Sequence, residues 1–304
     1  MVRFRTFRND DPPQLVEIWN EVLTGRSAAP LRNATPLERH VFAKPYFDPA
    51  GLIVAVDEND KLVGFAHAGF GPNKKETALS LQAGVTSVIL VMPSHQRKGI
   101  GSELLGRCEE YLIQKGARSV FAGPMWPLTP FYFGLYGGSD LPGFLVSDEG
   151  AAPFLEYHGY RPSNTYLVFQ RSLEKPVSIP DGRFAALRRK YTVRVVPPSS
   201  VGTFWHEAVF GPVEPLEFRL EEIVTAKPVA RALVWEMEGF SYRWGVPTAG
   251  ILSVQTREDS RRQGLGKLLM TNVLNYLQEQ YFGLVEVHAM ESNQAAVGLF
   301  KSVG

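Results

Sequence analysis

The sequence predicts an α/β fold, in the wider α+β sense, built as two tandem domains. A short β-branched run at residues 85–92 ends at Pro93, and a helical pattern then begins near Gly101 and closes at Gly116. The same succession of strand, glycine turn and helix recurs with its first glycine 165 residues later, at Gly264 (264 minus 99). The elements that precede the first turn also restart after residue 190, which indicates an internal repeat.

The composition supports a globular protein and excludes several classes of function. The chain has 304 residues, 44% of them hydrophobic, so its length favours two domains. Lys and Arg number 32 against 31 Asp and Glu, so no overall charge attracts nucleic acid or a membrane. The apolar runs are too short to span a bilayer, and no signal peptide is evident. The single cysteine, Cys108, is expected in the core and favours a cytoplasmic location, while six scattered histidines predict no metal site.

The first domain is expected at residues 1–173. Residues 2–8 alternate apolar and basic side chains, as a strand with one buried face does, and Pro12 and Pro13 open a helix. The later elements are expected as a helix at 35–43, strands at 52–56, 62–70 and 85–92, the helix closing at Gly116, a strand at 118–122, a helix at 149–158 and two short strands within 160–173. An aromatic insertion at 124–147 either packs over an apolar surface or forms a wall of an acceptor site.

Residues 174–190 are predicted to link the two domains, because prolines and the charged triplet 188–190 interrupt the pattern there. The second domain is expected at 191–304. Its elements are a strand at 191–196, a helix launched by residues 197–200, about three strands within 229–255, a helix closing at Gly283, a strand at 284–290 and a last helix. No strand follows that helix, so either the chain is truncated at its C-terminal end, the alternative we favour, or another element completes the second domain.

The first turn has the chemistry of a phosphate site. Gly99 and Gly101 allow close backbone approach, and the N–H groups that open a helix point outward with the positive end of the dipole behind them. Arg97 and Lys98 add cations. The turn lacks the glycine and lysine spacing of a nucleotide P-loop or a dinucleotide fingerprint. The candidate binding residues here are Gln96, Arg97, Lys98, Gly99, Ile100, Gly101 and Ser102.

The second turn repeats this chemistry. Its candidate binding residues are Arg261, Arg262, Gln263, Gly264, Leu265, Gly266 and Lys267. Seven residues separate Val254 from Arg261, whereas five separate Val91 from Gln96. We therefore expect a longer turn in the second domain, whose match to the pattern is less close than that of the first.

The pattern Val91-x-Pro93-x-x-Gln96-x-x-Gly99-x-Gly101 resembles the acetyl-CoA loop of the GNAT acetyltransferases. The resemblance covers nearly the whole chain as two copies, a layout similar to that of mycothiol synthases. It implies a mixed, mostly antiparallel sheet in each domain, with central strands that splay apart. It also implies an N-acetyltransferase that moves an acetyl group from acetyl-CoA to a primary amine, expected on a small molecule, without a covalent enzyme intermediate.

The resemblance also implies roles for residues outside the turns. The pantetheine arm would pair with the backbone of Ile89, Leu90 and Val91, and of Leu252 and Val254 in the second domain. The N–H of Val91 is the candidate donor to the oxyanion. Asn293 matches a pantetheine-binding Asn of the family, and Asp148 is its counterpart or a helix cap.

The chain departs from the family at the catalytic acid. The usual Tyr position, four residues before a glycine, holds Leu155 in the first copy and Phe300 in the second. Tyr157 lies two residues further on and so points to another helix face.

No carboxylate lies on either splayed strand to serve as a base. His67, Glu236 and Glu238 are candidates, although single residues of this kind are more often structural. The closer motif favours the first domain as the working half, with the reverse still open. The alternative function is a non-catalytic acyl-CoA-binding or scaffold protein.

Overall fold

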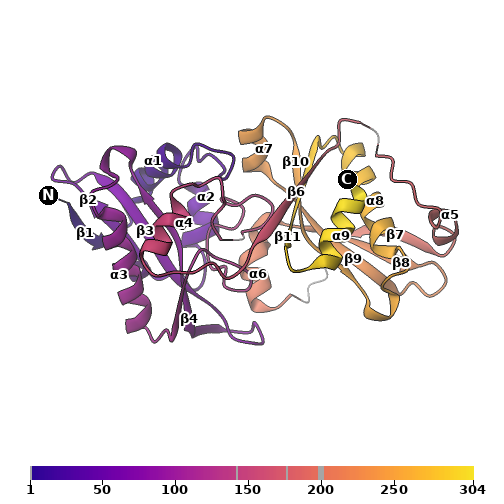
Figure 1. Ribbon diagram of the computed structural model, residues 1–304, viewed down its shortest axis with the longest axis horizontal. Helices are drawn as coiled ribbons and strands as arrows, with labels where there is room; N and C mark the ends of the chain where they lie inside the picture. Colours follow the sequence, from indigo (N-terminus) through magenta and orange to yellow (C-terminus); the bar gives the residue numbers. More distant parts are fainter. Residues whose placement is uncertain (1, 142, 176, 198–201) are drawn as a thin grey trace. The chain divides into compact units, whose positions relative to one another are not determined.

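The computed structural model describes residues 2–141, 143–175, 177–197 and 202–304, which form two compact units (Figure 1). The first unit comprises Met1–Arg161 and Gly202–Pro212, and the second comprises Pro162–Val201 and Val213–Gly304. The chain therefore passes from one unit to the other three times. Within the described ranges, every helix is too short or too polar to cross a membrane.

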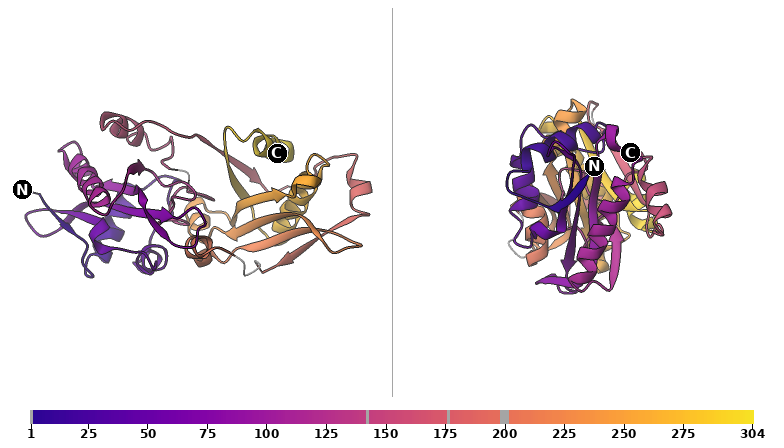
Figure 2. Two further views of the ribbon diagram at one scale, coloured as in Figure 1. Left: turned by 90° about the horizontal axis from the view of Figure 1, so that it is seen from below. Right: turned by 90° about the vertical axis from the view of Figure 1, so that its left-hand side faces the viewer.

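The first unit contains a five-stranded sheet in the order β1-β2-β3-β4-β5. Its strands are β1 (Arg3–Thr6), β2 (Leu52–Val56), β3 (Leu62–Pro72), β4 (Leu79–Val91) and β5 (Ser119–Ala122). Only β4 and β5 are parallel. Helix α3 (Ile100–Gln114) follows one face of the sheet (Figure 2), where Leu104, Cys108 and Leu112 are fully buried. The shorter helices of this unit are α1 (Pro12–Val22), α2 (Thr35–Leu37), a π-helix at Glu38–Phe42 and α4 (Ala151–Tyr157).

The second unit contains a six-stranded sheet in the order β6-β11-β10-β9-β8-β7. Its strands are β6 (Tyr166–Ser172), β7 (Tyr191–Val196), β8 (Leu216–Glu222), β9 (Pro228–Glu236), β10 (Thr248–Thr256) and β11 (Leu284–Met290). Only β10 and β11 are parallel. Helices α8 (Leu265–Glu279) and α9 (Gln294–Val303) pack their apolar faces into one core with the sheet. Two mixed, mostly antiparallel sheets flanked by helices confirm the expected fold class.

Strand β6 belongs to the second sheet, whereas the sequence placed it in the first domain. All seven of its residues pair antiparallel with β11, from Ser172 opposite Leu284 to Tyr166 opposite Met290. Phe169 also lies 5.7 Å, ring centre to ring centre, from Phe300 of α9. The local pattern predicts strand structure within 160–173, but it carries no information about which edge a strand joins. The second sheet is thus completed at this edge by a strand that precedes the expected linker.

Helix α6 (Phe204–Phe210) belongs to the first unit, although the sequence placed it in the second domain. Its Trp205 is fully buried, donates a hydrogen bond of 2.7 Å to the carbonyl of Pro127, and lies 4.8 Å from the ring of Tyr46. Thr203 caps the helix by accepting from the N–H of His206. The expected start of this helix at residues 198–200 lies outside the described residues. The observed units therefore differ from the expected division at 173 and 190.

Four further differences from the sequence predictions concern single elements. Strand β4 begins at Leu79, six residues earlier than expected, because a long hairpin with β3 extends the pairing beyond the apolar run. Strand β8 was not expected, since its charged residues mask its buried Phe218 and Leu220. Helix α7 (Glu238–Trp244) stands where a third strand was expected between 229 and 255. A single strand, β6, also replaces the two short strands expected within 160–173.

The aromatic insertion packs over the sheet face opposite α3. Phe131, which is buried, stacks on the ring of His67 at 4.1 Å, and the hydroxyl of Tyr132 lies 3.0 Å from Nδ1 of His67. Tyr132 in turn stacks on Trp19 of α1. These contacts favour the first of the two interpretations of the insertion, a loop packed over an apolar surface.

Candidate functional site

In the first unit, β4 separates from β5 halfway along its length. The two strands pair only from Ala83 opposite Ser119 to Thr86 opposite Ala122. The pairing of β4 with β3 then slips by one residue at Ser87, which forms a β-bulge. Beyond it, residues 88–91 pair with β3 on one side and, in the described chain, with no strand on the other.

The backbone of Val91 is directed toward the open side of β4. The next residue, Met92, donates its N–H to the carbonyl of Val63 on β3, at 2.9 Å. Because successive residues of a strand direct their N–H groups to opposite sides, the N–H groups of Val91 and Ile89 face away from β3. Among the described residues, the splayed strand therefore offers donors without a strand partner where it parts from β5.

The second unit repeats this splay. Strand β10 pairs with β11 only from Thr248 to Ile251, and its pairing with β9 slips at Leu252. Beyond this bulge, β10 continues to Thr256 with one side open. Arg257 corresponds to Met92, because its N–H donates to the carbonyl of Val229 on β9, at 2.8 Å.

The turns after the two splayed strands share one conformation. We call residues 96–102 the first cradle and residues 261–267 the second cradle. Gly99 and Gly264, which cap the following helices, have φ values of 81° and 87°. Arg97 and Arg262, two residues earlier, have φ values of 59° and 64°. A short 3₁₀ helix precedes each cradle, at Pro93–His95 and at Glu258–Ser260.

The expected longer turn in the second domain is therefore wrong. Strand β10 continues to Thr256 instead of ending at Val254, so every position keeps the same spacing of 165 residues. The counterparts of Ile89 and Val91 are then Val254 and Thr256. Leu252 lies at the bulge, in the position of Ser87, and not among the residues that face the open side.

Both cradles expose a run of backbone N–H groups. In the first cradle the N–H of Gln96 donates to Pro93 at 3.3 Å, and the next donor, Glu103, reaches Gly99 at 3.1 Å. In the second cradle the corresponding bonds join Arg261 to Glu258 and Leu268 to Gly264. Within the described chain, no internal acceptor is found for the six N–H groups between each pair of donors. Such a concave run of donors at a helix N-terminus binds anions.

The polar side chains of the cradles are largely engaged in holding the turns. Nε2 of Gln96 donates to the carbonyl of Val91 at 3.0 Å, and Nε of Arg261 donates to Thr256 at 3.2 Å. The next pair behaves alike: Lys98 donates to Ser94 at 2.9 Å, and Gln263 donates to Asp259 at 3.3 Å. These four side chains bond the turn to the strand and the 3₁₀ helix that precede it. Their backbone N–H groups remain the candidates for ligand contact.

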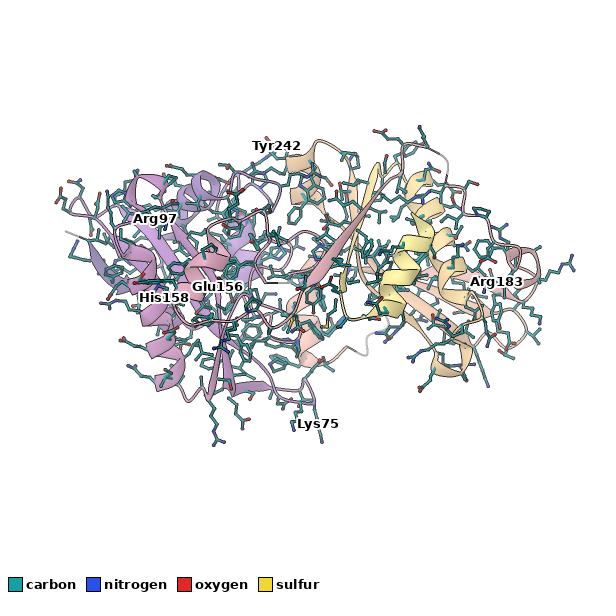
Figure 3. The ribbon with its side chains drawn as sticks, viewed as in Figure 1. Lys75, Arg97, Glu156, His158, Arg183 and Tyr242 are labelled. Atoms are coloured by element: carbon teal, nitrogen blue, oxygen red, sulfur yellow. The ribbon has the colours of Figure 1, made fainter. Side chains whose placement is uncertain are left out.

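The other expected binding residues have varied surroundings. Ile100 and Leu265 bury their side chains in the two cores, so only their backbone can reach a ligand. The hydroxyl of Ser102 lies 2.9 Å from Nε2 of His158, which follows α4 and lies beside α3 (Figure 3). Asn293 caps α9 by accepting from the N–H of Ala296 at 3.2 Å.

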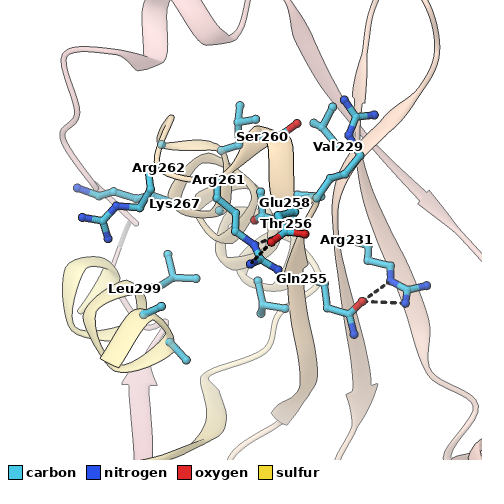
Figure 4. Close-up of a pocket in the computed structure, with 18 of the residues that line it drawn as sticks. Val229, Arg231, Gln255, Thr256, Glu258, Ser260, Arg261, Arg262, Lys267 and Leu299 are labelled. Carbon is cyan, nitrogen blue, oxygen red and sulfur yellow. Dashed lines mark hydrogen bonds and ion pairs between the residues drawn. The ribbon is translucent and has the colours of Figure 1, made fainter. Parts of the chain in front are cut away.

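A pocket of about 1320 Å³ opens beside the second cradle. It lies between the end of β10, the cradle and α9, where Leu299 faces it (Figure 4). Figure 4 also shows Arg261 reaching back to Thr256 along the pocket wall. The basic side chains that line the pocket are Arg183, Arg219, Arg231, Arg257, Arg261, Arg262 and Lys267. Arg183 was not expected, because nothing in the local sequence connects position 183 with position 264.

The candidate proton-transfer groups are poorly placed. His67 is fully buried, and this burial lowers its pKa to about 3. Glu236 and Glu238 are exposed at the end of β9 and the start of α7. Tyr157 is 84% exposed, and Phe300 is part of the second core. His67 is therefore a structural core residue.

The sequence profile described as the acetyltransferase (GNAT) family matches residues 14–127 and 220–304. The chain belongs to the GNAT acetyltransferase family. The two matched regions contain the two cradles, so both halves carry the GNAT pattern. Proteins of this family bind acyl-CoA. A search of curated proteins found no significant match to the sequence.

Three solved structures are similar to this GNAT chain along its whole length. One contains a GCN5-related glucosamine N-acetyltransferase region of a fungal multi-domain GH3 β-N-acetylglucosaminidase, with 18% identity and a TM-score of 0.71, and the chain spans 37% of its length. A GCN5-related N-acetyltransferase from Sphaerobacter thermophilus has 17% identity and a TM-score of 0.63, and the chain spans 91% of its length. A tandem GNAT protein from the clavulanic acid biosynthesis pathway has 16% identity and a TM-score of 0.66, and the chain spans 94% of its length. At these identities the likeness concerns the fold, and it supports a tandem GNAT arrangement.

Proposed function

We propose that the protein transfers an acetyl group from acetyl-CoA to a primary amine, on a small molecule, by direct attack. The observation that carries this proposal is the splayed, bulged strand that ends in a helix-capping cradle, built twice in one chain. The diphosphate of coenzyme A matches the exposed N–H groups of a cradle in charge and in hydrogen-bonding capacity. The open side of the strand matches the amides of the pantetheine arm, which would pair with Ile89 and Val91, or with Val254 and Thr256.

The proposed reaction requires few catalytic groups from the protein. The amine nitrogen attacks the thioester carbon, the C–N bond forms, the C–S bond breaks, and coenzyme A leaves as a thiolate that takes up a proton. The N–H of Val91, directed to the open side of β4, is the proposed donor to the oxyanion, a contribution of about 3 kcal/mol in comparable sites. Thr256 holds the corresponding position in the second unit.

Proton removal is assigned to water. His67 has its pKa lowered to about 3 by burial and is enclosed by Phe131 and Tyr132, so it does not face the open strand. The family's Tyr position holds Leu155 and Phe300. The rate is then expected to rise with pH until the pKa of the acceptor amine itself, and to shift when an amine of different pKa is used.

The test is release of free thiol from acetyl-CoA across a panel of small primary amines. Gly99→Val and Gly264→Val, each expected to block the phosphate approach in its own cradle, assign turnover to a unit. Gly106→Ala, within α3 and with no described atom beyond its own helix backbone within 4 Å of the added Cβ, is the control. Turnover that survives both valine substitutions together would contradict the cradle as the cofactor site.

The second candidate function is acyl-CoA binding without catalysis. The absent Tyr at both family positions favours it. Isothermal titration that shows coenzyme A binding, together with no thiol release for any amine, would select it over the transferase.

A further inference from the structure

A side chain from residues 174–190, the segment expected as the linker, lies over the second cradle. Arg183 lies just before the short helix α5 (Phe184–Leu187) in the second unit (Figure 3). A Cβ added to Gly264 would lie 3.0 Å from Cζ of Arg183 and 3.2 Å from its Nε and Nη1. The guanidinium is thus in contact distance of the cradle backbone. At Gly99 the same construction meets no atom of the described residues within 4 Å.

Asp181 holds Arg183 in this position. Nη2 and Nε of Arg183 donate to the two carboxylate oxygens at 2.6 and 2.8 Å, and the backbone N–H of Arg183 adds a third bond at 3.0 Å. The hydrogen bond from the Arg183 side chain is the main cause that lowers the pKa of Asp181, so the carboxylate is charged at neutral pH. Two parallel bonds fix the plane of the guanidinium.

Lys267 of the second cradle joins the same cluster. Its Nζ lies 3.7 Å from Asp181 and donates to the carbonyl of Pro180 at 3.3 Å. Arg262 lines the same pocket beside Gly264. Arg183 and Lys267 therefore share the carboxylate of Asp181. The pocket has seven basic side chains in its lining against Glu217 and Glu258, so its net charge is positive and suits a diphosphate.

The first cradle lacks this arrangement. At the spacing of 165 residues, Arg97 stands for Arg262, but Ser102 stands for Lys267. Nothing among the described residues takes the place of Arg183 over Gly99. The first cradle contains Arg97 and Lys98, and the second contains Arg261, Arg262 and Lys267. The two cradles therefore share their backbone conformation and differ by one cation.

We propose that Arg183 is a phosphate-binding residue of the second cradle, supplied by the segment between the two halves and preset by Asp181. The ligand class is a diphosphate ester, which the proposed function identifies as coenzyme A, and the inference rests on that function. A guanidinium already fixed by a carboxylate loses little side-chain entropy when a phosphate oxygen binds its remaining N–H groups. The second unit should then bind coenzyme A more tightly and with a steeper dependence on salt.

The experiment is isothermal titration of the full chain in the Gly99→Val background, so that only the second cradle reports. Arg183→Ala, Arg183→Lys and the control Arg189→Ala, an exposed residue of the same segment, are titrated with coenzyme A and with pantetheine, which has no phosphate. We expect Arg183→Ala to weaken coenzyme A binding about tenfold, the loss of one charge-assisted contact. Arg183→Lys should recover part of the affinity, Arg189→Ala should change nothing, and pantetheine binding should stay the same in all variants.

The outcomes separate this inference from the proposed function. Equal affinity of Arg183→Ala and Arg189→Ala for coenzyme A overturns the role of Arg183 and leaves the transferase proposal in place. An equal loss for pantetheine and coenzyme A also overturns it, because it shows that Arg183 only supports the fold. A wild-type chain that binds no coenzyme A defeats the proposed function itself.

Discussion

Replacing either cradle glycine by alanine should cost the same folding free energy. Gly99 and Gly264 have φ values of 81° and 87°, a region in which an L-residue costs about 1–2 kcal/mol. At Gly99 the new Cβ meets no described neighbour, and at Gly264 its three nearest atoms belong to the exposed guanidinium of Arg183, 3.0–3.2 Å away, which has to shift by only a few tenths of an ångström. The two costs should therefore agree within about 0.5 kcal/mol, the usual scatter for independent sites.

A third glycine provides a control of opposite sign. Gly106 lies within α3 at an ordinary helical φ, and outside its own helix backbone its added Cβ also meets no described atom within 4 Å. Gly106→Ala should stabilise the first unit by about 0.5–1 kcal/mol, since alanine is the better helix former. The three variants thus separate the effect of φ from the effect of added volume.

The assay is urea unfolding, combined with hydrogen exchange of the α3 and α8 amides to locate the loss in the correct unit. A loss of 1 kcal/mol corresponds to a decrease in melting temperature of about 2–4 °C for a domain of this size. If Gly99→Ala proves as stable as the wild type, the left-handed cap is not present. A difference above about 1 kcal/mol between the two cradle variants would refute their shared geometry.

Three other predictions concern the core and the boundaries of the units. Cys108 is buried, which raises its pKa to about 12, so a disulfide reagent at pH 8 should label it only after denaturation; labelling of the native chain within minutes would contradict its burial. Burial lowers the pKa of His40 to about 4 and of His67 to about 3, below the unfolded value near 6.5, so the unfolded state binds more protons and stability should fall as pH decreases from about 6.5 toward 4. At pH 5 each histidine should cost about 2 kcal/mol relative to pH 8, measured by urea unfolding, and a flat profile would exclude neutral buried histidines. Trp205→Ala should destabilise the first unit by about 3–5 kcal/mol, whereas Phe169→Ala should destabilise the second, and hydrogen exchange that shows the reverse would contradict the unit assignment.

The local elements could be predicted where a short apolar run stands between turn residues. Residues 52–56, 191–196 and 284–290 were expected as strands with the bounds they have in the structure. The cradles could be located because a positive φ at a helix start favours glycine, and Gly99 and Gly264 occupy the same position in the two repeated turns. The sequence did not predict where β10 ends, because Thr256 is polar but still pairs with Ala230.

Long-range placement could not be predicted. The bond of 2.6 Å between Gln170 of β6 and Glu286 of β11 joins residues 116 apart, and no local pattern encodes it. The same holds for Arg183, which lies in the segment expected as the linker and whose guanidinium is in contact distance of Gly264. Patterns of period 2 and 3.6 identify strands and helices, and they leave the choice of partner to the packing of the whole chain.

Three passages of the chain between the units limit how this protein can be dissected. A fragment cut at the expected linker would carry β6 away from β11 and leave its hydrogen-bonding edge bare, a common cause of aggregation in recombinant products. The other fragment would keep α6 and its Trp205 without the surface that buries them. Because each half of the sequence supplies an element to the other unit, the loss of one copy should also destabilise the copy that remains.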